Sequence, residues 1–183
     1  MFPIMIFPPM NVYSLKGKLI LSNFLTSSST RSYDNSVLYI DTPVTAIIED
    51  SRMEDFIGDV KQIKNIKNQL ENAAQMTGGD PFRINSWHTG INPFSFYSEN
   101  PHTNIERWGT AAFGSPRYTH FHASGYNPGD VAIQLFDASI QFEDVPYWES
   151  GQFTFLRRED ILSLFPREIR QQLFHTSLEN IGL

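Results

Sequence analysis

The sequence predicts a mixed α+β fold, in which a mostly antiparallel β-sheet carries one main helix packed on it and a helical C-terminal tail. Short runs rich in β-branched residues alternate with turn residues, which is typical of strands. A single segment has the three- and four-residue apolar spacing of an amphipathic helix. No internal repeat or low-complexity linker divides the chain. We therefore expect an irregular apolar N-terminal arm over residues 1–14 and a single domain over residues 15–183.

Composition excludes several classes of function. The chain has 183 residues, of which 40% are hydrophobic, and this is enough for one well-packed core. Its net charge of −6 argues against a nucleic-acid partner, because phosphate backbones are bound by a clustered basic face. The absence of cysteine excludes disulfides and thiolate ligands and leaves the cytoplasm as the default location. Residues 1–10 are too short to span a bilayer and lack the leading positive charge of a signal peptide, so no membrane partner is expected.

The first half of the chain predicts a meander of strands. A strand over residues 18–23 precedes two β-branched runs, 37–41 and 44–49. Thr42 and Pro43 separate these runs, so we expect them to form two antiparallel strands joined by a tight connection. A short strand over residues 53–57 follows.

One helix is expected after this meander. Asp59 is its predicted N-cap, and Gly78 with Gly79 is expected to end it. Apolar side chains recur along one stripe, which predicts core packing against the sheet. These residues are Val60, Ile63, Ile66, Leu70 and Ala73.

The second half is expected to contain a strand over 83–88, a loop over 94–107 and a hairpin turn over 146–151. The tail over 159–173 has a helical pattern that Pro166 must split. Further strands are expected over residues 131–137, 139–142 and 152–156.

The stretch over residues 118–125, Tyr-Thr-His-Phe-His-Ala-Ser-Gly, carries the chemistry. In an extended strand Tyr118, His120 and His122 project to one face and Phe121 to the other. Two imidazoles two residues apart on one strand can converge on a divalent metal ion. The alternative is that both histidines are ordinary structural or solvated residues.

Turn residues and short strand patterns follow one another in segments 36–43, 55–59, 89–93, 109–112 and 132–134. Their order resembles the C-terminal half of the aminopeptidase T (thermophilic metalloprotease) family. The resemblance implies a peptidase-like scaffold over roughly residues 15–156. The metal ligands of that family do not carry over, since their places fall near Lys18, Ser86, Thr110 or Ala112, and Gln134.

A different ligand set is expected in that place. His88 lies two residues beyond the position of a lost glutamate, and with His120 and His122 it would make a neutral three-histidine site with open positions for water and substrate. Zinc or iron is the expected ion. Arg117 and Tyr118, beside the pair, are the candidates for catalytic residues that position a substrate, although Arg117 could instead pair with Glu106 or Asp130.

Two functional hypotheses follow. The first is a metal-dependent hydrolase or oxygenase that acts on a peptide, an amino acid or another small polar molecule. The second is a non-catalytic peptide- or protein-binding module. This hypothesis accounts for the missing metal-binding carboxylates of the resembled family without requiring a new metal site. A homodimer or a partner subunit is compatible with either hypothesis. The loop residue His102 is expected at the surface.

Overall fold

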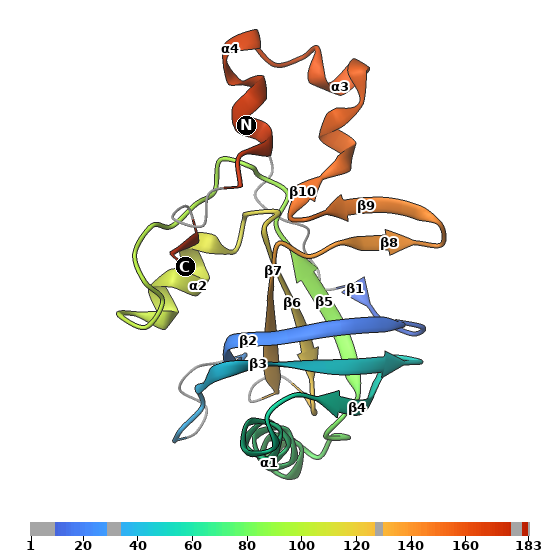
Figure 1. Cartoon of the computed structure of the whole chain (residues 1–183), viewed down its shortest axis with the longest axis vertical. Coiled ribbons are helices and arrows are strands. Elements are labelled where there is room, and N and C mark those ends of the chain that lie inside the picture. Colours follow the sequence, from blue (N-terminus) through green and yellow to red (C-terminus); the bar gives the residue numbers. More distant parts are fainter. Residues whose placement is uncertain (1–9, 29–33, 127–129, 177–180, 183) are drawn as a thin grey trace. The chain divides into compact units, whose positions relative to one another are not determined.

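The computed structural model describes residues 10–28, 34–126, 130–176 and 181–182 (Figure 1). It has a mixed α+β fold with mostly antiparallel sheet and few helices, as the sequence predicted. Most of the predicted N-terminal arm lies outside the described residues. The end of that arm, Met10–Asn11, forms the short strand β1, which pairs with β5 in the register Met10↔Trp87 and Asn11↔Ser86.

A seven-stranded sheet holds most of the strands. The pairs β1–β5, β2–β3, β2–β7 and β3–β4 are antiparallel. The order across the sheet is β1, β5 (Ile84–Thr89), β6 (Tyr118–Ala123), β7 (Val131–Phe136), β2 (Gly17–Ser27), β3 (Leu38–Glu49) and β4 (Arg52–Ile57).

A smaller antiparallel sheet has the order β10, β9, β8, with bounds Gln152–Phe153, Val145–Glu149 and Ile140–Phe142. The remaining elements are helical. They are α1 (Val60–Thr77), α2 (Ile105–Ala112), η1 (Thr154–Arg157), α3 (Glu159–Leu162), α4 (Arg167–Arg170) and η2 (Gln171–Phe174).

Contacts divide the described residues into two compact units. The unit formed by Pro8–His88 and His120–Leu135 is called the sheet unit here. The unit formed by Thr89–Thr119 and Phe136–Leu183 is called the hairpin unit, since it contains β8 and β9. Strands β5, β6 and β7 each begin in one unit and end in the other.

Helix α1 confirms the strongest prediction of local structure. The Asp59 carboxylate accepts a hydrogen bond from the Gln62 backbone N–H at 2.9 Å, and Gly78 ends the helix with a left-handed φ of 80°. Ile66, Leu70 and Ala73 are fully buried, and the helix lies against β3 (Figure 1). Val60 was expected in the same stripe but is 82% exposed, and in the first turn Gln62 is buried instead.

The predicted hairpin at residues 42 and 43 is wrong: β3 is one continuous strand. The register against β2 shifts between Leu21 and Asn23, and Asn23 has a positive φ of 61°. Such a bulge interrupts the ladder of backbone hydrogen bonds. Pro43, which has no N–H to donate, lies opposite this interruption and therefore does not break the strand.

Two further predictions in the hairpin unit are wrong. Residues 105–107, expected in a loop, begin helix α2, whose N-cap Asn104 accepts a bond from the Arg107 N–H at 3.0 Å. Residues 146–149, expected in a turn, belong to strand β9, and Pro146 pairs with Gln141 at a register shift. The C-terminal tail is only roughly as predicted, since Pro166 precedes α4 and the tail consists of single turns of helix.

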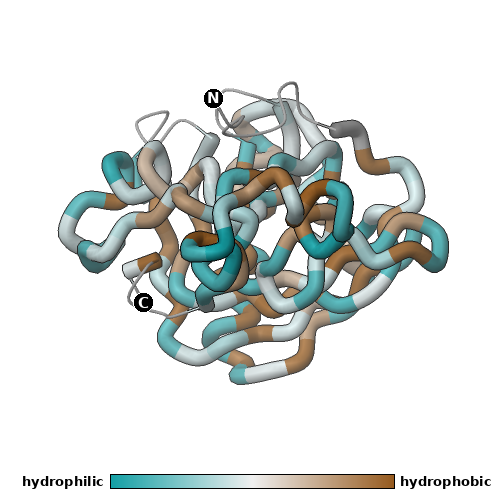
Figure 2. Tube along the Cα trace, turned by 90° about the horizontal axis from the view of Figure 1, so that it is seen from above, coloured by the Kyte–Doolittle hydropathy of each residue, from teal (hydrophilic) through white to brown (hydrophobic). Residues whose placement is uncertain are grey.

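Polarity alternates along the chain over short distances. Figure 2 shows hydrophilic and hydrophobic residues following one another closely along the coloured part of the trace, which is the part of the chain that the structure describes. Within the described residues, no helix combines the length and the apolar character that are needed to cross a membrane.

Candidate metal centre

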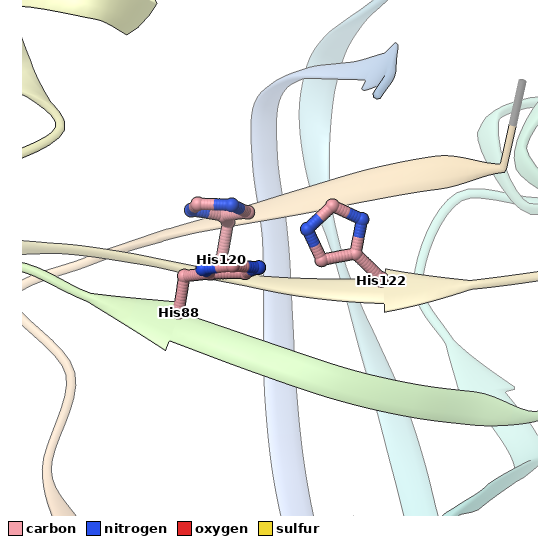
Figure 3. A group of neighbouring side chains, drawn as sticks. All are labelled: His88, His120 and His122. Carbon is pink, nitrogen blue, oxygen red and sulfur yellow. The ribbon is translucent and has the colours of Figure 1, made fainter. Parts of the chain in front are cut away.

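Two neighbouring strands of the sheet unit bring three imidazoles together. His88 lies near the end of β5, and His120 with His122 lies on β6, which neighbours β5 in the sheet. Figure 3 shows the three side chains gathered on one side of these strands. One nitrogen of each ring can be chosen so that all three lie within 4.8 Å of one another. The structure therefore places together the three histidines that the sequence singled out.

The rings adopt two orientations. The rings of His88 and His120 are stacked, with centroids 4.9 Å apart and an interplanar angle of 7°. The ring of His122 stands edge-on to both, at 4.9 Å from His88 and 5.0 Å from His120. On the opposite face of β6, Phe121 stacks on Trp87 with centroids 6.1 Å apart. This alternation is what an extended strand requires.

The end of β6 is fixed to the rest of the sheet unit just beyond His122. The Asn85 side-chain amide donates to the Gly125 carbonyl at 2.7 Å, and the Ser124 backbone N–H donates to the Arg83 carbonyl at 3.1 Å. A Cβ at Gly79, after the end of α1, would lie 2.2 Å from the Gly125 Cα, so only glycine allows this approach. These contacts hold the histidine strand against β5 and α1.

His122 is held by two polar side chains from other strands. Its Nδ1 lies 2.7 Å from the Ser28 Oγ and 2.9 Å from the Asp130 Oδ2. Ser28 directly follows β2 and Asp130 directly precedes β7. Sequence reasoning did not find either residue, and 94 positions separate Ser28 from His122. Asp130 was considered only as a partner for Arg117.

Burial keeps two of the imidazoles in the form that can bind a metal. His88 is 9% exposed and His120 is 5% exposed. Desolvation lowers the pKa of His88 to about 4, assisted by the charge of His122 and opposed by that of Asp130. Desolvation also lowers the pKa of His120 well below its ordinary value, with further repulsion from His122 and His88. Both rings are therefore neutral at neutral pH, and only neutral imidazole has a lone pair to donate.

The lowered pKa values predict an acid-sensitive apo protein. In the unfolded chain a histidine binds its proton near pH 6.5, whereas in the folded chain His88 binds it near pH 4. Between these values the unfolded state holds more protons, so stability falls as pH falls, with a slope of up to about 1.4 kcal/mol per pH unit for each such histidine. We expect the melting temperature of metal-free protein to drop between about pH 7 and pH 5.

Substitution isolates this contribution. His120→Gln removes one titrating ring and should flatten the dependence of melting temperature on pH. A His120→Gln curve that runs parallel to that of the wild type would contradict the assignment.

The other two predicted site residues have contacts in the hairpin unit. The Arg117 guanidinium donates to both carboxylate oxygens of Asp137, at 2.7 Å each, so its carboxylate partner is Asp137. The Tyr118 ring packs edge-on against Trp108, with centroids 4.9 Å apart, and is 4% exposed. Their role in positioning a substrate stays a prediction. His102 is exposed and precedes α2.

The three imidazoles suit a borderline divalent ion. Imidazole nitrogen is a ligand for zinc, copper, iron and nickel alike. Metal–nitrogen distances of about 2.0–2.1 Å allow two ligand nitrogens to be at most about 4.2 Å apart. The 4.8 Å limit within this group is close to that separation. The stacked rings of His88 and His120 must rotate relative to each other before their in-plane lone pairs converge on one ion.

Comparison with known proteins gives a fold and no family. No known family profile matches the sequence, and no curated protein matches it. Among solved structures, the chain is similar to 2,5-dihydroxypyridine dioxygenase from Pseudomonas putida KT2440, with a TM-score of 0.53 and 15% sequence identity. The match covers 81% of this chain and 42% of that one, so the chain spans less than half the length of its structural neighbour. A likeness at this identity shows a shared fold.

These comparisons overturn the resemblance to aminopeptidase T. The structural match is to a dioxygenase, and no peptidase profile matches. The resemblance rested on turn residues and on the order of strands. Glycine, proline and aspartate recur at turns for conformational reasons in many unrelated proteins, so they carry little family information.

Proposed function

We propose that this chain is a metal-dependent enzyme domain of the oxygenase type, in which His88, His120 and His122 bind a divalent ion. The observation that carries the proposal is the gathering of three imidazoles from two neighbouring strands, with candidate ligand atoms within 4.8 Å of one another. Three histidines in so small a space repel one another when protonated, so a purely structural role would gain little from their grouping.

Iron(II) is the ion that the proposal favours. The structural neighbour is named as a dioxygenase, and this supports oxygen chemistry over hydrolysis. A bound iron(II) ion would supply one-electron chemistry with dioxygen. Three ligands from the protein also leave coordination positions open for other groups.

The residues around the ion have separate tasks. Burial of His88 and His120 keeps both rings neutral and keeps water away from them. His122, whose side chain is 15% exposed, is the most accessible of the three. We propose a small polar substrate, and 2,5-dihydroxypyridine, named for the neighbour, is the first to test.

Oxygen uptake tests the proposal. Protein purified without added metal is reconstituted with iron(II) under anaerobic conditions and then mixed with 2,5-dihydroxypyridine and other dihydroxylated aromatic compounds in an oxygen electrode. We expect uptake that requires iron(II), substrate and an intact His120, and no uptake with zinc-loaded protein. Wild-type protein that binds iron(II) but consumes no oxygen with any such compound argues against the oxygenase assignment. Protein that binds no metal argues for the binding module.

A further inference from the structure

Ser28 and Asp130 are fixed relative to each other by the backbone. The Ser28 N–H donates to the Asp130 carbonyl at 2.9 Å, directly beyond the β2–β7 pair Ser27↔Val131. From this pairing both side chains reach the same atom, Nδ1 of His122. The Asp130 side chain is only 4% exposed. The strand ends therefore form a rigid cradle for one edge of the His122 ring.

The chemistry of this cradle decides which nitrogen carries the proton. A carboxylate accepts hydrogen bonds and cannot donate them, so the bond to Asp130 requires a proton on His122 Nδ1. In a neutral ring the lone pair is then on Nε2. Figure 3 shows one nitrogen of His122 turned toward the rings of His88 and His120 and the other turned away. Because Nδ1 is held in the cradle, the nitrogen that faces the other two rings is Nε2.

We propose that Asp130, assisted by Ser28, is a positioning residue that holds His122 as the Nδ1–H tautomer and so presents Nε2 to the metal ion. This inference rests on the proposed function. Outer carboxylates of this kind fix the ring orientation of a ligating histidine and raise its basicity. A negative charge next to the ligand also compensates part of the charge of a divalent ion, which three neutral imidazoles do not.

The cradle differs from a catalytic triad and from a contact that merely stabilises the fold. It is not a serine–histidine–aspartate triad, because the serine and the carboxylate contact the same nitrogen, whereas a triad uses opposite nitrogens. It is also poorly suited to stabilising the apo protein. The Asp130 Oδ1 atom is buried and accepts no hydrogen bond from any described residue, and such a group costs free energy.

The tautomer can be measured without metal. Long-range ¹H–¹⁵N spectra of the apo protein at about pH 8, where histidine is neutral, distinguish the two tautomers of each ring. His122→Gln identifies the His122 signal. We expect the Nδ1–H form in the wild type and a change toward the Nε2–H form in Asp130→Ala. An Nε2–H form in the wild type overturns the inference, whatever the protein does with metal.

Metal affinity tests the consequence. Asp130→Ala should weaken binding of iron(II) or zinc by about 10- to 100-fold in titration calorimetry, and Asp130→Asn, whose amide oxygen can still accept from Nδ1–H, should recover part of the loss. The melting temperature of the apo protein should stay the same or rise in both variants, because a buried, partly unsatisfied carboxylate is removed. Ser28→Ala should have the smaller effect.

Asp137→Asn is the matched control. The Asp137 carboxylate accepts hydrogen bonds from Arg117 within the hairpin unit, and it is not one of the two groups that contact His122 Nδ1. Asp137→Asn should therefore lower the melting temperature and leave metal affinity unchanged. If the wild type binds metal and Asp130→Ala binds it with the same affinity, the positioning role of Asp130 is contradicted, but the proposed metal centre is not. Absence of binding in the wild type contradicts the proposed function instead. A fall in apo stability with unchanged metal affinity would make Asp130 merely structural.

Discussion

Alanine at His88, at His120 or at His122 is expected to remove metal binding while leaving the apo fold almost as stable as the wild type. Each imidazole would contribute through the ion, and losing one ligand of three costs more than the roughly 10- to 100-fold that losing an outer partner costs. Replacing buried His88 or His120 also removes the penalty of keeping that ring neutral in acid.

Thermal shift on adding metal measures this directly. A ligand at 100 times its Kd stabilises a protein by about 2.7 kcal/mol, and at a concentration equal to its Kd by only about 0.4 kcal/mol. A variant with 100-fold weaker affinity should therefore lose most of the metal-dependent rise in melting temperature at the same metal concentration. Elemental analysis of protein purified without chelators provides the second readout.

His102→Ala is the control, because this exposed residue should keep the full metal response. If neither iron(II) nor zinc changes the melting temperature of the wild-type protein, the proposed metal centre is contradicted. An equal response in all four variants would show that metal binds elsewhere on the chain.

Structural features that depend only on neighbouring residues, such as helix caps, could be predicted from the sequence. Helix α1 begins and ends where its caps predict, because the Asp59 bond and the positive φ at Gly78 involve only neighbouring residues. Helix α2 has an equally local cap at Asn104, but Gly109 and Thr110 lower its helix propensity and concealed it. Its burial of Trp108 and Ala112 compensates for that low propensity.

Proline misled the prediction of strands twice for the same reason. Pro43 and Pro146 both lie within strands, next to shifts in register. Proline has no backbone N–H, so it removes no hydrogen bond from a sheet at a position where the partner strand presents no carbonyl to accept one. Whether this is so depends on the partner strand, and in β3 that partner is β2, whose bulge at Asn23 no local pattern announces.

The residues of the candidate site also fall into two groups, those that local sequence predicts and those that depend on strand pairing. The alternation of a strand places His120 with His122 and away from Phe121, and this could be predicted from the sequence. Ser28 and Asp130 could not be found in this way, because they reach His122 only through the pairing of β2 with β7. Arg117 likewise finds its carboxylate, Asp137, 20 positions away. Long-range partners follow from topology, which turn residues alone did not reveal.

Aspartate in place of Ile66 is expected to unfold the sheet unit. Ile66 is fully buried on the face of α1 that lies against β3. The substitution removes the apolar contacts of a core isoleucine, at about 2–5 kcal/mol, and buries a carboxylate that has no prepared partner, at several kcal/mol more. The total approaches the whole stability of a typical domain, about 5–15 kcal/mol. Loss of soluble expression, or a melting transition that has disappeared from circular dichroism, is the expected result.

Lys64→Asp provides the matched comparison, since it introduces the same side chain two positions away on the exposed face of the same helix. Its effect should stay within about 0.5 kcal/mol in urea denaturation. Ile66→Val, which keeps the apolar contact and removes one methylene, should cost only about 0.5–1.5 kcal/mol and should bind metal like the wild type, because Ile66 belongs to the face of α1 that packs on β3 and is not one of the three clustered histidines. Equal stability of Ile66→Asp and Lys64→Asp would mean that α1 does not pack by this face. The seven-stranded sheet would then lack the helix that covers β3 in the structure.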